Sequence, residues 1–167
     1  MYDGYQTLKV VREGKIVTVT LNRPAVKNAT NAKMHQELMR VFPEIGTDEE
    51  AHVVILTGEG DTFSAGGDMS ALRFAVDNQP RWMESMREAR QILYNVIDLD
   101  RPIIAKINGH AIGMGATLAS AIRIRSTLLA LVFTKPARAT FEIACARRVP
   151  TLRKYWTQPA VVRGSRM

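Results

Sequence analysis

Two segments of the chain combine a short apolar run, a glycine-rich loop and a following helical pattern, and they constrain the fold more than any other feature. The first run spans 52–57 and leads into a loop at 58–68, and the second spans 103–107 and leads into a loop at 108–115. Apolar runs of this length, bounded by turn residues, are typical of strands buried on both faces. Strands of this kind alternating with helices predict an α/β fold with parallel-type strands.

The remaining elements are predicted from hydrophobic periodicity and turn residues. Val17, Val19 and Leu21 alternate with threonines, which is the pattern of a strand with one face in the core. Apolar residues three and four positions apart predict helices, and proline is expected to stop the first of them. In chain order we expect strands 5–12 and 15–21 about a Glu13-Gly14 turn, a helix from Asn31 to Pro43, strand 52–57, a helix over 80–97 whose core side includes Trp82, Met83, Met86, Ala89, Leu93 and Val96, strand 103–107, and a helix from about 116 to 122.

The two glycine-rich loops carry little side-chain surface, which leaves their backbone N–H groups approachable. An oxyanion hole needs two such donors aimed at one oxygen, and a helix N-terminus adds a favourable partial charge. The alternative is that each glycine set only makes a tight turn at a strand end. A dinucleotide-binding fingerprint is excluded because 113–118 lacks its third glycine, and no Gly-Lys-Ser or Gly-Lys-Thr of a phosphate-binding loop occurs.

Three motifs follow one another along the first 122 residues. They are Val19-Thr20-Leu21-Asn22-Arg23-Pro24 with Lys27-Asn28-Ala29, then Phe63-Ser64-Ala65-Gly66-Gly67-Asp68-Met69, then Pro102-Ile103-Ile104-Ala105-Lys106-Ile107-Asn108-Gly109-His110-Ala111-Ile112-Gly113-Met114-Gly115. In order and spacing the chain resembles the enoyl-CoA hydratase/isomerase family, or crotonase superfamily, over residues 5 to about 122. The resemblance implies the N-terminal portion of that family's fold, a crotonase-like spiral of ββα units.

The resemblance also implies a site for acyl-CoA thioesters, whose enolates are stabilised by the backbone amides of Gly67 and Met114. Coenzyme A is then part of the substrate, and no separate cofactor and no metal are expected. Asp68 also suits the N-cap of a following helix, and His110 also suits a polar contact within its loop. The implied substrate-binding residues are Val26, Lys27 and Ala29 at the nucleotide end of coenzyme A, and Ala65, Gly66, Asp68, Met69, His110 and Gly113 along the pantetheine and thioester.

The acid–base residues depart from the family pattern. Hydratases of the family carry a glutamate where this chain has Thr117, and a second glutamate lies in a later motif that is not found here. The one carboxylate side chain after Asp100 is Glu142, which does not align. Water addition needs a general acid and a general base, and threonine does not titrate near neutral pH, so negligible hydratase activity is expected. Some members lack the first glutamate and run other chemistries, so whether the chain is an enzyme stays open.

The net charge of +7 comes entirely from the C-terminal end. Residues 1–120 hold 13 basic and 15 acidic residues, whereas residues 121–167 hold 10 basic residues and one acid. This change divides the chain into a crotonase-like core, 1–122, and a basic divergent tail, 123–167, which is expected to be disordered or non-native. A shifted reading frame or an alternative end would produce such a tail, the other explanation being an unusual but selected terminus. The basic residues are scattered and form no recognition motif, so no nucleic-acid partner is expected.

The cysteine count and the absence of long apolar runs predict the cellular compartment and the kind of partner. A single cysteine, Cys145, excludes an internal disulfide framework and fits a reducing cytoplasm. No apolar run approaches the ~18 residues of a membrane span, and residues 1–15 lack the apolar stretch of a signal peptide. Family members assemble as trimers through later helices that are not recognisable here, so a clean trimer is not expected.

These observations predict an acyl-CoA thioester-binding protein of the enoyl-CoA hydratase/isomerase family with a backbone oxyanion hole. The alternative is a non-catalytic truncated remnant that at most binds CoA thioesters or pairs with a complete family member.

Overall fold

The computed structural model describes residues 2–70, 73, 78–125 and 131–133, and its centre is a mixed five-stranded sheet. The strands lie in chain order: β1 (Leu8–Glu13), β2 (Ile16–Leu21), β3 (Val53–Gly58), β4 (Ile103–Ile107) and β5 (Leu131–Phe133). β1 and β2 form the expected antiparallel hairpin, and every later neighbour pairs in parallel. The predicted α/β class and the parallel strands β3 and β4 are confirmed. Each of the two strands buries alternate residues, so only one face is fully buried, rather than both faces as expected.

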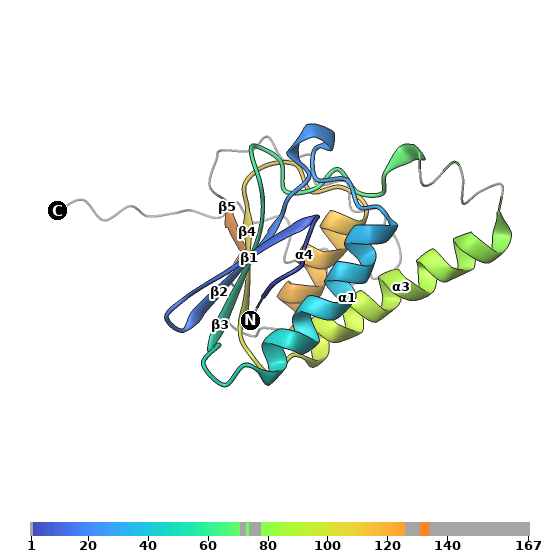
Figure 1. Cartoon of the computed structure of the whole chain (residues 1–167). Coiled ribbons are helices and arrows are strands. Elements are labelled where there is room, and N and C mark those ends of the chain that lie inside the picture. Colours follow the sequence, from blue (N-terminus) through green and yellow to red (C-terminus); the bar gives the residue numbers. More distant parts are fainter. Residues whose placement is uncertain (1, 71–72, 74–77, 126–130, 134–167) are drawn as a thin grey trace, which may run out of the picture.

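Helices cover one side of this sheet (Figure 1). They are α1 (Ala32–Thr47), α3 (Gln79–Asp98) and α4 (Met114–Arg125), with a short 3-10 turn, η1 (Pro24–Val26), after β2. α3 packs across both α1 and α4, while α4 contacts β4 and α1 contacts β1. None of the described helices is long and apolar enough to cross a membrane.

The core lies between the sheet and these helices. Val17, Val19 and Leu21 of β2 are fully buried, as their alternation with threonines predicts. Leu38 and Phe42 of α1 are buried on the helix side, and burying a side chain of this size contributes about 1.5–3 kcal/mol. Asn31 caps α1, its side-chain oxygen accepting a hydrogen bond from the Met34 amide at 2.9 Å. Residues 28–31, which follow β2 and η1, thus lie at the N-terminal end of α1.

The expected end of the first helix at Pro43 is wrong. α1 continues through Pro43 to Thr47. A proline inside a helix has no N–H for the carbonyl four residues earlier, which here is that of Met39. The Met39 carbonyl instead accepts a hydrogen bond from the Asn95 side chain of α3 at 2.8 Å. A tertiary contact thus supplies the donor that the proline lacks.

The expected core side of the second long helix is also partly wrong. α3 buries Glu88, Ile92 and Val96, whereas Trp82 and Met86 are 37% and 42% exposed, and Met83 is exposed as well. In Figure 1 the first turns of α3 extend beyond α1 and α4, so apolar residues there have no core to enter. The buried stripe begins only where α3 crosses the other two helices.

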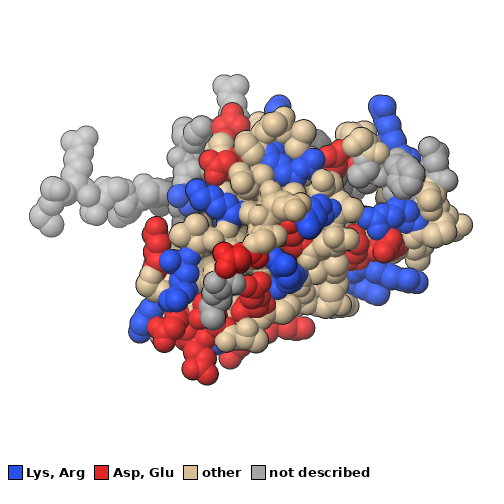
Figure 2. All heavy atoms as spheres, viewed as in Figure 1, with Lys and Arg blue, Asp and Glu red and all other residues tan. Residues whose placement is uncertain are grey.

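The predicted boundary at residue 122 falls inside an element. α4 continues to Arg125, and β5 adds to the sheet beside β4. The rest of the predicted tail, 126–130 and 134–167, lies outside the described residues. On the face shown in Figure 2, basic and acidic side chains of the described residues are interspersed, in keeping with the near balance of charge over 1–120.

Candidate functional site

The two glycine-rich loops lie side by side beyond the carboxyl ends of β3 and β4. The Ser64 amide donates to the His110 carbonyl at 3.0 Å, and the Ile112 amide donates to the Ser64 carbonyl at 2.9 Å. Gly66 has a φ of +87°, and a Cβ there would lie 2.8 Å from the Ile112 carbonyl oxygen. Only glycine accommodates both that conformation and that approach, so the Gly66 position is what lets the loops meet.

Asn108 fixes the starting points of both loops. Its side chain, at the end of β4, donates to the carbonyls of Gly58 and Gly60 at 2.8 Å each. Its side-chain oxygen accepts from the Gly58 amide at 3.3 Å. One amide side chain therefore replaces the strand pairing that stops where β3 and β4 end.

The loop after β3 is also bonded to the segment that leads into α1. The Thr30 amide donates to the Gly66 carbonyl at 2.7 Å, and the Asp68 amide donates to the Thr30 carbonyl at 2.9 Å. This is a short parallel bridge between Thr30 and Gly67. In such a bridge the groups flanking Gly67 bond to Thr30, so the N–H of Gly67 itself points to the opposite side.

Two backbone donors are left without an acceptor in this arrangement. Neither the Gly67 amide nor the Met114 amide donates a hydrogen bond to any described residue. Met114 is the first residue of α4, where helical N–H groups have no partner within the helix. A Cβ on the neighbouring Gly113 would lie 4.0 Å from the Gly67 nitrogen. The two free amides thus come from adjacent stretches of backbone.

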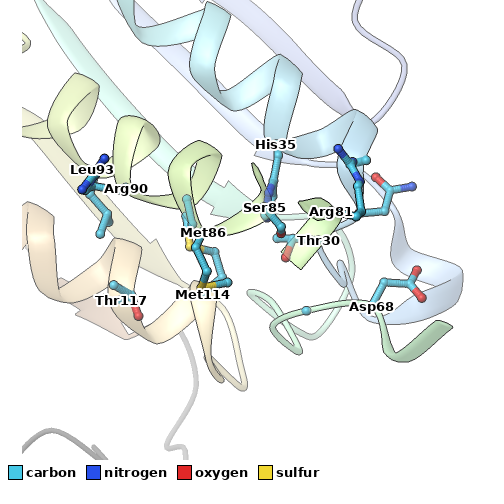
Figure 3. Close-up of a pocket in the computed structure, with 14 residues that line it drawn as sticks. Thr30, His35, Asp68, Arg81, Ser85, Met86, Arg90, Leu93, Met114 and Thr117 are labelled. Carbon is cyan, nitrogen blue, oxygen red and sulfur yellow. The ribbon is translucent and has the colours of Figure 1, made fainter. Parts of the chain in front are cut away.

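A cavity of about 550 Å³ opens at these amides. In Figure 3 its labelled side chains come from α1 and the segment before it, from α3 and α4, and from the loop after β3. The cavity brings together four of the predicted site residues, Gly67, Asp68, Met114 and Thr117. The lining residues are Thr30, Asn31, Ala32, His35, Gly67, Asp68, Arg81, Ser85, Met86, Ala89, Arg90, Leu93, Met114 and Thr117.

The other predicted site residues do not line this cavity. Val26 and Lys27 are exposed at η1, and Lys27 adopts a left-handed φ of 53°. Met69 is 64% exposed, and His110 is exposed, with its backbone carbonyl bonded to Ser64. The remaining four lie within the backbone that frames the cavity: Ala29, Ala65, Gly66 and Gly113.

Asp68 is occupied by protein partners. Its carboxylate accepts hydrogen bonds from both the amide and the hydroxyl of Ser70, which is the expected helix-capping role, and from Arg23 at 3.0 Å. The Ser70 hydroxyl, together with Arg23, holds the pKa of Asp68 below its usual value. Asp68 is therefore a charged wall of the cavity and is poorly placed to exchange protons near neutral pH.

Sequence reasoning missed an ionisable pair behind the cavity. His35 of α1 lies on the cavity wall, and its Nδ1 is 3.2 Å from the Glu88 carboxylate of α3. Arg81 is 3.9 Å from the other oxygen of Glu88. Burial lowers the pKa of His35, although the hydrogen bond and charge of Glu88 act in the opposite direction. Across the described residues, no group of three or more potential metal ligands is found.

The chain is similar in sequence to known proteins that share one family. The family model described as Enoyl-CoA hydratase/isomerase matches residues 11–129. Human Enoyl-CoA delta isomerase 2 is 34% identical over 120 residues, which are 69% of this chain and 29% of that protein. The Short-chain-enoyl-CoA hydratase of Clostridium acetobutylicum is 36% identical over 115 residues, which are 68% of this chain and 43% of that protein.

A solved structure shares the fold of the matched part of the chain. The crystal structure of an enoyl-CoA hydratase/carnithine racemase from Magnetospirillum magneticum superposes with a TM-score of 0.67 at 36% identity. The match covers 72% of this chain and 45% of that one, so the chain spans less than half the length of these relatives. The family model, the sequence relatives and the solved structure agree, and the chain belongs to the enoyl-CoA hydratase/isomerase family of the crotonase superfamily.

Proposed function

We propose that the chain binds an acyl-CoA thioester in the cavity and stabilises its enolate with the Gly67 and Met114 amides. The observation that carries this proposal is the pair of adjacent N–H groups that bond to no described residue and border a cavity of about 550 Å³. Family membership supports the substrate class, because the matched relatives are named for reactions of enoyl-CoA thioesters.

The physical basis is electrostatic preorganisation. Negative charge develops on the thioester oxygen when a proton leaves the neighbouring carbon, and two fixed donors stabilise that charge more than they stabilise the neutral carbonyl. Met114 begins α4, so the partial positive charge of the helix N-terminus adds to the effect. The pantetheine and nucleotide of coenzyme A would extend past the loops towards Lys27, which is exposed and positively charged.

A second candidate is binding without turnover, and Thr117 favours it. Thr117 stands on the cavity wall where hydratases of the family carry a glutamate. Its hydroxyl donates to the Gly113 carbonyl at 3.0 Å and has no titratable proton near neutral pH. Binding and turnover must therefore be measured separately.

The test of binding is the thermal stability of the protein with and without a short acyl-CoA. A ligand that binds only the folded state stabilises it by about 2.7 kcal/mol at a concentration of 100 times Kd. Free coenzyme A serves as the control for the nucleotide part alone. An unchanged melting temperature with every acyl-CoA tested would contradict the proposal.

The donor role is tested at Met114 because proline is tolerated at the first position of a helix. Met114→Pro removes the N–H and should lower enolate formation by about 10²–10³, the usual cost of one lost donor. Met114→Leu keeps the N–H and measures the contribution of the side chain. Gly67→Pro removes the other donor and should have a comparable effect, and an unchanged rate in both folded proline variants would refute the assignment.

A further inference from the structure

A histidine, a glutamate and an arginine form a connected group that the proposed function does not use. His35 Nδ1 is 3.2 Å from Glu88 Oε2, and Glu88 Oε1 is 3.9 Å from Arg81. His35 and Glu88 are each 8% exposed. The group lies where α3 crosses α1, next to the cavity that the Gly67 and Met114 amides border.

The second ring nitrogen of His35, Nε2, has no hydrogen-bond partner among the residues that the structure describes. No fully buried side-chain nitrogen or oxygen among the described residues lacks a partner, so Nε2 is an accessible atom. Because His35 lines the cavity, the carboxylate on one side of the ring leaves the other nitrogen available to a bound molecule.

We propose that His35 is the catalytic base of this site and that Glu88 positions it. The proposal rests on the proposed function, since it needs an acyl-CoA thioester with its carbonyl oxygen at the Gly67 and Met114 amides. Thr117 offers no base, and Asp68 is held by Arg23 and Ser70. His35 is then the only lining residue in the described part of the chain with a neutral nitrogen able to take a proton.

The step is a proton transfer that balances without a co-reactant. The C–H bond next to the thioester carbonyl breaks, the proton passes to Nε2 of His35, and the electron pair becomes the enolate. The two amides hold the enolate oxygen, and the Glu88 carboxylate stabilises the imidazolium through Nδ1. If the proton on Nε2 is replaced by deuterium from the solvent before the carbon is reprotonated, the result is isotope exchange, and protonation of a different carbon of an enoyl chain moves the double bond.

The charges around His35 are consistent with a neutral base at rest. Glu88 and Arg81 of α3 are its near neighbours, and Arg90 of α3 and Asp68 of the loop complete the charged lining of the cavity. Burial lowers the pKa of His35 and outweighs the opposing effect of Glu88, while Arg81 lowers it further. A lowered pKa favours the neutral imidazole, which is the form that accepts a proton.

The test follows exchange of the α-protons of a saturated acyl-CoA in D₂O by mass spectrometry. His35→Gln should lower the exchange rate by about 10²–10⁴, the usual contribution of a positioned base. His52→Gln, a substitution at an exposed histidine outside the cavity, should leave the rate unchanged. Acyl-CoA binding by His35→Gln, measured as a rise in melting temperature, shows that the variant is folded and that its site is formed.

The Glu88→Gln variant tests whether Glu88 acts on His35 by its charge, because a purely structural role of Glu88 would not shift the pH dependence of exchange. Glu88 raises the pKa of His35, so its neutralisation should shift the acidic limb of the pH–exchange profile to lower pH and reduce the plateau rate. Glu49→Gln, at an exposed carboxylate, should leave the profile unchanged. The pH profile of Glu88→Gln therefore tests the proposal even if the His35→Gln variant does not fold.

Each outcome separates the two proposals. If the wild type binds acyl-CoA but His35→Gln exchanges as fast as the wild type, His35 is not the base and the proposed binding function stands. If the wild type binds and shows no exchange, the inference is likewise overturned. If the wild type binds no acyl-CoA, the proposed function itself fails.

Discussion

At the scale of single residues, the proposed function predicts that Thr117 limits hydration. It lies on the cavity wall in the first turn of α4, and its hydroxyl is bonded to the Gly113 carbonyl. We expect hydration of a short enoyl-CoA far below the ~1–10³ s⁻¹ of an ordinary enzyme. Thr117→Glu should raise the rate only partly, because it restores one carboxylate of two. Loss of enoyl-CoA absorbance measures both proteins.

The control for that substitution is on the same helix. Ser120→Glu adds the same charge about one turn further along α4, outside the cavity lining, and should leave hydration at the wild-type level. Rapid hydration by the unmodified chain would instead mean that another residue activates water. In that case His35 would be the first residue to test.

Single residues also show where sequence reasoning reaches its limit. Gly67, Asp68 and Met114 stand in continuous motifs, and Thr117 follows the last motif at the position of the family's glutamate, so the resemblance predicts all four. The structure brings all four to one cavity. His35 and Glu88 are 53 positions apart, on two helices whose crossing no local pattern specifies. The sequence offers one indication of this pair. Glu88 stands four and eight positions before Ile92 and Val96, on the side of α3 that is buried, but periodicity alone cannot identify the partner of Glu88.

At the scale of elements, the contact between α1 and α3 replaces a hydrogen bond that Pro43 removes. The Asn95 side chain donates to the Met39 carbonyl at 2.8 Å. Asn95→Ala should destabilise the protein by about 1 kcal/mol, the usual net value of such a bond. In a Pro43→Ala background, the backbone N–H gained at position 43 can bond to the Met39 carbonyl itself, so Asn95→Ala should cost less there. Urea unfolding of the four proteins gives the coupling.

That double-mutant cycle has a clear negative outcome. Equal losses of unfolding free energy on Asn95→Ala in both backgrounds would mean that the Asn95 side chain acts through another contact, such as its hydrogen bond with Gln91.

The contact between α1 and α3 also explains why the ends of elements are harder to predict from the sequence than their types. Proline is a correct local stop signal, and it fails here because a neighbouring helix satisfies the carbonyl that the stop would otherwise expose.

At the scale of the whole molecule, Glu37 ties the N-terminal segment to the core. Its buried carboxylate accepts from the amides of Gln6, Thr7 and Leu8 and from the Thr7 hydroxyl. Burial alone would raise the pKa of Glu37, but these donors outweigh it and hold the pKa below its usual value. A lowered pKa contributes stability above the unfolded value, near 4.3, and this stability is lost as the pH falls through the folded value.

Glu37→Gln should therefore lower the free energy of unfolding by about 2 kcal/mol at pH 7. The difference from the wild type should narrow as the pH falls from the unfolded value towards the lowered folded value, because the wild-type carboxylate then becomes protonated. Glu13→Gln, at an exposed position, is the matched control and should change little at either pH. Denaturant melts at a series of pH values check this, and a difference that is independent of pH would show that charge is not the cause.

The pairing of β3 with β4 also determines where the chain tolerates a change in length. Val54 pairs with Ile103 and Leu56 with Ala105, and Asn108 then joins the two strand ends. A strand advances about 3.3 Å per residue and turns alternate side chains to opposite faces. One residue inserted in β4 would therefore carry Asn108 out of reach of the Gly58 and Gly60 carbonyls and move Met114 away from Gly67. One residue inserted at the hairpin turn between β1 and β2 would leave both loops in place. Insertions and deletions are thus absorbed at the hairpin and excluded between the parallel strands and the loops that follow them.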